Sequence, residues 1–360
     1  MGDLTLKQLI LVFAVTLILF LGISNRDNIA FQMFQTGIEN QFKTRFLSPV
    51  TDGLHIGLCG AGSAIPAPRA SGPCISILAG DQLYIIDAGS KSARNLTFMG
   101  LKPGDISAVF LTHFHSDHID GLGELATLRW FQGAHPKPLQ VYGPEGINQV
   151  VDGLNMAYEI NNRERITNFN RQPEMLSGAG MEAIMIPTMP GLELYQVFKT
   201  EDFEVLAFDV SHRPSERSLG YKVIYKDRSA VISGDTVARQ AVTKASIGAD
   251  LLVHNALSPR LVAAIQNTAT ELGLVFLAEL MTHLNKLHAT PMQAAKVAQS
   301  AGAKHLLYYH VIPPLIAPGQ GRLFLDGAQN VFPNYTIGRD GVVITLPANS
   351  DQVIVVPSTL

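Results

Sequence analysis

The chain has 360 residues, of which 47% are hydrophobic and 16% are charged. A chain of this length and composition can bury a large core, which excludes a mainly disordered protein. Its formal net charge is -3. It therefore lacks the overall excess of Lys and Arg with which nucleic-acid-coating proteins displace counterions from phosphates.

The first 25 residues are the most apolar part of the chain. No charged residue occurs from residue 8 to residue 25, and residues 9–23 are almost entirely aliphatic or Phe. Such a run reaches the lower limit of length for a membrane-spanning helix, so we expect a transmembrane anchor over residues 1–25. The alternative is a signal peptide, with Lys7 in its charged region and a cleavage site at residues 22–24. Either interpretation directs the rest of the chain to or across a membrane. We expect a membrane-anchored protein whose main domain is extracytoplasmic.

Residues 26–53 connect this segment to the rest of the chain. Apolar residues recur there at spacings of three and four: Phe31, Phe34, Ile38, Phe42 and Phe46. This spacing predicts an amphipathic helix or linker that packs against the domain or a membrane surface. Asp52-Gly53 then marks a turn.

From residue 54 onward, short β-branched runs alternate with helical segments, with no internal repeat or low-complexity tract between them. We expect a single α/β domain over residues 54–350, because many strands are apolar on both faces, as in sheets covered by helices. The expected strands are residues 54–58, 75–78, 83–86, 109–111, 141–142, 205–208, 221–224, 231–232, 251–253, 306–309 and 342–345. Helices are expected after Ser258-Pro259 and Thr290-Pro291, the second with Thr290 as its N-cap and Gly302 as its end.

The segment from residue 155 to residue 190 fits this alternation least, and we expect an inserted lid there. It carries Tyr158, Arg163 and Arg165. We expect these side chains to contact the substrate, because a forked guanidinium group suits the oxygens of a phosphate or a sulfate.

The apolar strand at residues 109–111 runs into four polar residues that suit a metal ion: His113, His115, Asp117 and His118. Because side chains alternate along a strand, His113 and His115 point the same way. The following turn lets Asp117 and His118 address a second position nearby. Neutral imidazole and carboxylate are ligands that Zn²⁺ takes in proteins, so the spacing predicts a metal site.

The sequence His-Phe-His-Ser-Asp-His at residues 113–118 matches the HxHxDH motif of the metallo-β-lactamase-fold hydrolases. Its surroundings resemble the ribonuclease Z and arylsulfatase-like branch of that superfamily. The resemblance extends from about residue 54 to residue 347. It includes the Gly-rich run at residues 57–73, Asp87-Ala88-Gly89, and residues 142–146, 233–236 and 306–310. It implies the αββα metallo-β-lactamase sandwich, in which two mixed β-sheets pack face to face with helices outside, here preceded by the N-terminal transmembrane helix.

Carried over position by position, the resemblance implies two divalent metal ions. The implied ligands are His113, His115 and His212 for one ion and Asp117, His118 and His310 for the other, with Asp235 bridging them. Asp87 is implied as an acceptor that supports the ligand loops without binding metal. Zn²⁺ is the expected metal, with Mn²⁺ or Fe²⁺ as alternatives that the same donor atoms suit.

Two neighbouring metal ions would lower the pKa of a bridging water and leave hydroxide ready to attack an ester. We expect Asp117 to be both a ligand and the acceptor of the water's proton. His254 and His288 resemble histidines in two active-site loops of ribonuclease Z, and we expect both to act as substrate-contacting or acid groups. Asn255 stands where that family usually has Glu, which argues against a tRNA-type role.

These features predict a metal-dependent hydrolase that cleaves a phosphodiester or a sulfate ester in a small anionic substrate. One alternative is a carbonyl hydrolase such as a lactonase or thioesterase, because the same metal site serves that reaction. Another is a tRNA 3′-end endonuclease, if the domain is cytoplasmic. A catalytically silent binding protein is the remaining alternative, and the complete ligand set argues against it.

Three expectations concern partners. The N-terminal helix is expected to bind a membrane. Nucleic acid is not expected, because residues 144–212 lack the Gly/Pro-rich basic arm with which ribonuclease Z enzymes hold tRNA. A homodimer is compatible with the sequence, because relatives often dimerise.

The two cysteines, Cys59 and Cys74, lack the CxxC spacing of a structural zinc site. Ordinary packing is the simplest interpretation. A disulfide is the alternative for an extracytoplasmic domain.

Overall fold

The computed structural model describes residue 7 and residues 25–43, 51–168, 177–187, 189, 193–212, 217–358 and 360. The chain divides into two units, Met1–Ser48 and Pro49–Leu360. In the first unit, helix α2 spans Arg26–Lys43 and exposes Phe31 and Phe34. Apart from Lys7 and Asn25, the expected transmembrane segment lies outside the described residues. No helix among the described residues is long and apolar enough to cross a membrane.

The second unit is built on two β-sheets. The first has the strand order β15-β14-β1-β2-β3-β4-β5-β6 and the second the order β13-β12-β11-β10-β9-β8-β7. The strands of the first sheet are β1 (Gly53–Gly60), β2 (Cys74–Ala79), β3 (Gln82–Ile86), β4 (Ile106–Phe110), β5 (Leu139–Gly143), β6 (Met181–Met185), β14 (Val343–Pro347) and β15 (Ile354–Val356). Those of the second are β7 (Tyr195–Lys199), β8 (Phe203–Val210), β9 (Ser218–Tyr225), β10 (Arg228–Ile232), β11 (Leu251–Leu257), β12 (His305–Ile312) and β13 (Tyr335–Ile337).

Both sheets are mixed. In the first, β1 and β2 are antiparallel whereas β3, β4, β5 and β6 are parallel. In the second, β8, β9 and β10 are antiparallel whereas β10, β11, β12 and β13 are parallel. Parallel strands that run side by side deliver their carboxyl ends to one edge of a sheet. Loops that carry functional residues typically leave from that edge.

The main core lies between the sheets. Leu54, Ile56 and Leu58 alternate along β1 and join a single buried cluster with Val205 and Val223 of the second sheet. This alternation follows from the two-residue period of a strand, which places every second side chain on the same face. Aromatic rings join the two sheets as well, since Tyr84 stacks on Phe203 with ring centroids 4.3 Å apart.

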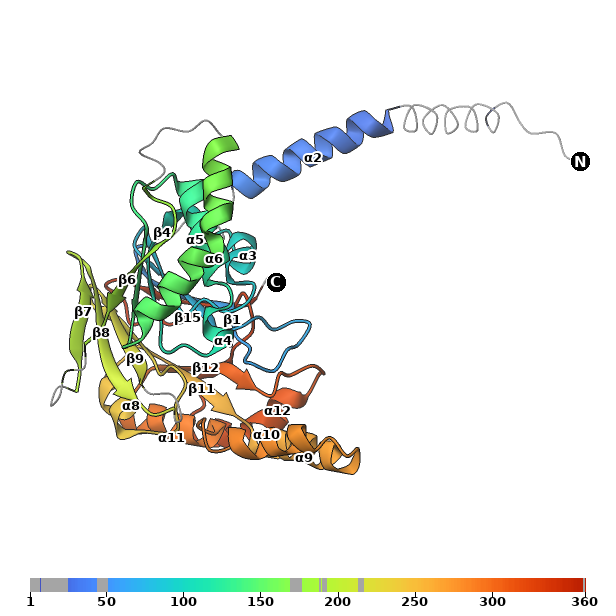
Figure 1. Ribbon diagram of the computed structural model, residues 1–360. Helices are drawn as coiled ribbons and strands as arrows, with labels where there is room; N and C mark the ends of the chain where they lie inside the picture. Colours follow the sequence, from blue (N-terminus) through green and yellow to red (C-terminus); the bar gives the residue numbers. More distant parts are fainter. Residues whose placement is uncertain are drawn as a thin grey trace, which may run out of the picture. The chain divides into compact units, whose positions relative to one another are not determined.

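Helices cover the outer faces. Helices α3 (Ser92–Phe98), α5 (Leu122–Gly133) and α6 (Ile147–Asn168) lie on one side, and α8 (Gln240–Ala245), α9 (Pro259–Glu271), α10 (Val275–Leu284), α11 (Pro291–Ala301) and α12 (Gln320–Leu325) on the other (Figure 1). The short helices α4 (Ser116–Ile119) and α13 (Ala328–Val331) complete the described set. A second buried cluster, which includes Leu252, Leu306 and Ala298, joins the second sheet to its helices. The expected pair of mixed sheets with helices outside is therefore confirmed.

Local signals account for the start and end of α11. The Thr290 side chain accepts from the Gln293 backbone N–H, and the Gln293 side chain accepts from the Thr290 N–H, which forms a capping box. Pro291 occupies the first turn. Gly302 follows the helix with a φ of 66°, in the left-handed region that glycine adopts without steric cost.

The segment expected as an inserted lid, residues 155–190, contains regular elements where the structure describes it. Its first part is the second half of α6, and residues 181–185 form β6, which pairs in parallel with β5 at the edge of the first sheet. Asn155 joins the two elements, because its side chain bonds to both the N–H and the carbonyl oxygen of Met181. These parts of the segment therefore belong to the layered fold.

Candidate metal centre

The expected ligands come from the ends of four strands and from one short helix. His113 and His115 lie in the loop after β4, and Asp117 and His118 follow on α4. His212 comes directly after β8, Asp235 after β10, and His310 lies near the end of β12. The chain reaches this edge of the sandwich several times, and each time it places a histidine or an aspartate there.

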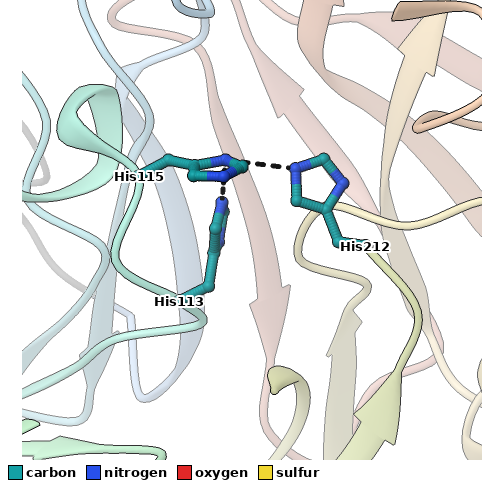
Figure 2. A group of neighbouring side chains, drawn as sticks. All are labelled: His113, His115 and His212. Atoms are coloured by element: carbon teal, nitrogen blue, oxygen red, sulfur yellow. Dashed lines mark hydrogen bonds between the residues drawn. The ribbon is translucent and has the colours of Figure 1, made fainter. Parts of the chain in front are cut away.

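Three histidines form the first cluster (Figure 2). The Nδ1 atom of His115 lies 3.0 Å from Nε2 of His113 and 3.2 Å from Nε2 of His212. His113 and His212 are buried, whereas His115 is exposed. One ligand atom from each residue falls within 4.8 Å of the others, which is a spacing that a single ion can span.

Asp117, His118 and His310 form the second cluster. The Nε2 atom of His310 lies 3.3 Å from Oδ2 of Asp117, and Nε2 of His118 lies 3.7 Å from the same oxygen. Asp235 lies between the two clusters. Its Oδ2 atom is 3.1 Å from Nε2 of His310, 3.4 Å from Nε2 of His118 and 3.7 Å from Nε2 of His212.

Hydrogen bonds decide which nitrogen each of three imidazoles turns to the centre. Nδ1 of His118 donates to Oδ2 of Asp87 at 2.8 Å, and Nδ1 of His212 lies 3.2 Å from the carbonyl oxygen of Leu287. The Thr112 hydroxyl donates to Asp87, so it accepts from Nδ1 of His113 at 3.0 Å. In each of these three residues Nδ1 is therefore engaged away from the centre, and Nε2 is the nitrogen that faces the cluster and would bind a metal.

Unsatisfied buried atoms also fit a cation. Among the described residues, Nε2 of His118 and Oδ1 of Asp235 are buried without a hydrogen-bond partner. A buried polar atom without a partner is costly and needs an explanation, such as an ion that binds there. Imidazole nitrogens and carboxylate oxygens within 4.8 Å of one another are a donor set that suits Zn²⁺, Mn²⁺ or Fe²⁺.

The electrostatics of the site favour the same conclusion. Burial lowers the pKa of His113 well below its usual value, which keeps the imidazole neutral. Burial also opposes a charge on His118, but the Asp87 and Asp235 carboxylates outweigh it and hold the pKa of His118 well above its usual value. Burial raises the pKa of Asp235, but His310 and His118 outweigh it and hold that pKa well below its usual value. The two carboxylates therefore create a negative potential that stabilises a cation beside His118.

Asp87 lies behind the expected ligands and bonds to the segment that carries them. It is fully buried, and its Oδ1 atom accepts from the Thr112 backbone N–H at 2.8 Å. Its Oδ2 atom accepts from His118 Nδ1, from the Thr112 hydroxyl at 2.9 Å and from the Tyr309 hydroxyl at 3.4 Å. One carboxylate thus fixes the loop after β4 and orients His118 directly and His113 through Thr112.

His310 reaches the centre through a β-bulge that the sequence did not reveal. Asn255 of β11 pairs with Tyr309, but the next residue, Ala256, pairs with Val311, so His310 has no partner in β11. Its φ is 48°, in the left-handed region. A bulge of this kind bends the strand and re-aims one side chain, here towards Asp117 and Asp235.

Glycines allow the backbone to pack closely beneath α4. A Cβ atom on Gly89 would lie 2.2 Å from the carbonyl oxygen of Asp117, and one on Gly72 would lie 2.7 Å from the same oxygen. A Cβ atom on Gly121 would lie 2.2 Å from the carbonyl oxygen of Gly89. The Gly-rich run and the Asp87-Ala88-Gly89 turn therefore form a tight backbone support for Asp117.

A disulfide closes the loop that contains Gly72. It joins Cys59, at the end of β1, to Cys74, at the start of β2, with the Cα atoms 5.0 Å apart. The sequence left packing and a disulfide open for these cysteines, and the structure has the disulfide.

The two histidines expected to act on the substrate differ in position. His288 lies beside the metal cluster, with Nδ1 3.8 Å from Oδ2 of Asp235 and 3.1 Å from Nδ2 of Asn255. His254 is fully buried, and its Nδ1 atom lies 2.9 Å from the Asn255 carbonyl oxygen. Burial lowers the pKa of His288 to about 3 and that of His254 to about 4, so both are neutral at pH 7. With His212 and Asp235, His288 also forms a group whose ligand atoms lie close enough together to hold a metal ion, which sequence reasoning did not identify.

The expected substrate residues lie on α6. Tyr158 packs over Gly123 of α5, where a Cβ atom would lie 2.3 Å from its ring. Arg165 lies over the Phe131 ring at 5.4 Å and bonds to Asn161, and the exposed Arg163 faces Glu159 at 3.7 Å. These described contacts are with α5 and α6 themselves.

The fold and the clustered ligands agree with a match to the family model described as Metallo-beta-lactamase superfamily, which covers residues 69–264, more than half of the chain. The chain belongs to the metallo-beta-lactamase superfamily. Taken with its ribonuclease Z relatives, this membership makes it a metal-dependent hydrolase.

Two curated relatives named ribonuclease Z illustrate the similarity. The protein from Mycolicibacterium gilvum is 28% identical over 274 residues, which cover 74% of this chain and 87% of the relative. The protein from Mycobacterium marinum is 29% identical over 271 residues, which cover 73% and 88%. These relatives carry the name of a ribonuclease, whereas the sequence argued against nucleic acid as a partner.

Solved structures give the same fold. The short form of human tRNase Z is 25% identical, with a TM-score of 0.57, and the match covers 81% of this chain and 99% of the human one. A metallo-beta-lactamase fold protein from Bacillus subtilis has a TM-score of 0.57 at 18% identity and covers 82% and 100%.

Proposed function

We propose that this chain hydrolyses phosphodiesters with water and uses two divalent metal ions. The proposed ligands are His113, His115 and His212 for one ion and Asp117, His118 and His310 for the other, with Asp235 shared. The observation that carries the proposal is the position of Asp235, whose single Oδ2 atom lies within 3.1 to 3.7 Å of histidines from both clusters. A carboxylate within reach of both ligand groups is suited to hold two neighbouring ions.

Two such ions, when bound, would supply a water of lowered pKa and positive charge for the oxygens of a phosphodiester. The chain's own residues handle the protons. Burial raises the pKa of Asp117, but the His310 hydrogen bond and the charge of His118 outweigh it and lower the pKa overall. Asp117 is therefore a carboxylate at neutral pH, and its oxygen is able to accept the proton of the attacking water.

The leaving oxygen needs a hydrogen-bond donor when the P–O bond breaks. His288 lies beside Asp235 and is neutral, so it can stabilise that oxygen through an N–H group. Asn255 holds the ring in place through the 3.1 Å contact with its Nδ1 atom. His254 is fully buried behind Asn255 and supports this loop.

The test is a panel of chromogenic substrates with the metal-loaded protein: a bis-aryl phosphodiester, an aryl phosphate, an aryl sulfate, a lactone and a β-lactam. Turnover of the phosphodiester is the expected result. Turnover of the sulfate or the lactone alone would replace the proposal with a sulfatase or a carbonyl hydrolase. His115→Ala is the blank, and Asp117→Ala should lose turnover while it keeps the fold. Metal analysis of the purified protein tests the expectation of Zn²⁺ against Mn²⁺ and Fe²⁺.

RNA is the second candidate substrate, and the ribonuclease Z relatives favour it. The net charge of -3 and the amide of Asn255, at the position of the family's Glu, favour a smaller phosphodiester. A precursor tRNA with a 3′ extension belongs in the same panel. Cleavage at the 3′ side, absent in His115→Ala, would select RNA over the small substrate.

We also propose that the domain works outside the cytoplasm and is tethered by residues 1–25. The uncharged stretch at residues 8–25 supports this location, and so does the Cys59–Cys74 disulfide, because disulfides persist in oxidising compartments. Alkaline phosphatase fused after Leu360 should be active in cells, since that reporter needs an oxidising compartment. An inactive fusion that is expressed in full would contradict this location.

A further inference from the structure

An exposed apolar tip caps the hairpin formed by α9 and α10. The two helices lie side by side along the lower edge of the view in Figure 1, and the Gln266 side chain bonds to Thr282 across them at 2.9 Å. Gly273 forms the turn with a φ of 70°. The tip consists of Leu272, Leu274, Val275, Phe276 and Leu280.

The hairpin buries only one of its faces. Val262 and Met281 pack with Leu257 of β11 and Ile312 of β12 in a small buried cluster. The side chains at the tip are instead exposed to solvent: Leu272 is 69% exposed, Val275 66% and Phe276 80%. Large apolar side chains gathered on one exposed surface mark a site that contacts another apolar body.

We propose that this hairpin tip inserts into a lipid bilayer. The tip is the turn of a hairpin, so it can enter the acyl boundary as a wedge, as interfacial apolar segments do. Glu271 precedes the tip and Glu279 lies next to Leu280, and both are acidic, so the attraction does not depend on anionic headgroups. Two other segments of the chain also favour a membrane as the apolar partner. Residues 8–25 are uncharged and apolar, and α2 exposes Phe31, Met33 and Phe34.

The position of the hairpin gives the contact a consequence for the active site. One end of the hairpin continues from β11, which carries His254 and Asn255. The other end leads to Leu287, whose carbonyl oxygen lies 3.2 Å from Nδ1 of His212, and to His288. A tip held in a bilayer would turn this side of the metal centre towards the membrane, at a distance of about one helix length, roughly 20 Å for the 13 residues of α9.

The experiment uses the full chain with vesicles of phosphatidylcholine. A polarity-sensitive fluorophore is attached at Phe276→Cys, and the matched control carries it at Glu201→Cys, in the exposed turn between β7 and β8. The native cysteines are buried in the disulfide and do not compete for the label. The expected result is a shift of the label at position 276 to shorter wavelength, with quenching by nitroxide-labelled lipid, and no response at position 201.

Four outcomes would overturn the proposal. If the chain binds the vesicles in a flotation assay while the emission of the label at position 276 does not change, the N-terminal segment alone binds lipid. A chain that does not float would remove the contact altogether. If the emission of the label at position 276 shifts without vesicles, and the shift grows with protein concentration, the tip contacts a second copy of the chain. If that shift is independent of protein concentration, the tip contacts the chain's own N-terminal unit. None of these outcomes depends on which ester the enzyme cleaves.

Discussion

Gly89 is the position where one added methyl group should disturb the metal centre most directly. A Cβ atom there would lie 2.2 Å from the Asp117 carbonyl oxygen and 2.5 Å from the carbonyl carbon of Gly72. Both contacts are with backbone, so no side chain can rotate away, and Cβ atoms essentially never come closer than 3.0 Å to another heavy atom. In Gly89→Ala, α4 must therefore retreat by about 1 Å, and Asp117 and His118 move with it.

Overpacking of this kind costs about 1–3 kcal/mol, and the lower chain entropy of alanine returns up to about 1 kcal/mol. A displacement of about 1 Å at the reacting groups lowers a catalytic rate by about 100-fold. We therefore expect a modest loss in the free energy of unfolding and a large loss in kcat/KM. Urea unfolding and hydrolysis of a bis-aryl phosphodiester measure the two effects, and metal content per chain measures the geometry without any substrate.

Gly153→Ala is the matched control. Gly153 lies within α6, and no heavy atom comes within 4 Å of an added Cβ. Alanine there should stabilise the helix by up to about 1 kcal/mol and leave hydrolysis unchanged. If Gly89→Ala kept both the full metal content and the parent kcat/KM, the close backbone contact beneath α4 would not be needed to position Asp117 and His118. That result would refute the prediction.

Three further predictions follow from the same site. Asp87→Ala leaves His118 and Thr112 without their acceptor. It should lower the free energy of unfolding by about 3–5 kcal/mol, measured by urea unfolding, and weaken metal affinity about 10- to 100-fold, measured by metal titration. An unfolding curve like that of the parent would contradict this prediction. Burial lowers the pKa of His254 to about 4, below the unfolded value of about 6.5. The native state therefore binds fewer protons between these values, and the free energy of unfolding should fall by up to about 3 kcal/mol as the pH drops from 6.5 to 4. This loss should be smaller in His254→Asn, and the same dependence of stability on pH in the parent and the variant would contradict the prediction. The Cys59–Cys74 disulfide joins residues 15 apart in the sequence, and its reduction should lower the free energy of unfolding by about 3 kcal/mol. The measurement is urea unfolding compared with and without a reductant. The reductant should have no effect on a Cys59→Ser/Cys74→Ser variant.

The interior of the fold was predictable because interior strands are apolar runs. Each strand expected from the sequence overlaps a strand of the structure. The described strands that were not expected are β6, β7, β13 and β15, and these are the outermost strands of the two sheets. An edge strand pairs on one side only, and β13 and β15 are three residues long with no fully buried side chain. Such segments lack the pattern by which a strand is recognised.

The candidate site divides in the same way. The motif at residues 113–118 is local, so its spacing alone predicted a metal site, whereas His212, Asp235 and His310 came from the resemblance to a family. Sequence could not show that His310 needs a bulge, because no local preference places a histidine at a φ of 48°. Nor could it show the contact between Asn255 and His288, which lie on either side of the α9–α10 hairpin.

Backbone strain at Asp87 and His310 shows how the fold prepares the centre. Both residues have positive φ values, 58° and 48°, and a non-glycine residue in this region typically stores about 1–3 kcal/mol. Asp87 is held by its bonds to Thr112 and His118, and His310 by the paired residues on either side of it in β12. All these partners belong to the protein itself, so the two strained residues keep their positions before an ion binds. His115 is different, because it is exposed and has ordinary extended backbone at the start of α4. Substitution of Asp87 should therefore lower stability and metal affinity together, whereas His115→Ala should lower metal affinity and change stability by no more than about 0.5 kcal/mol.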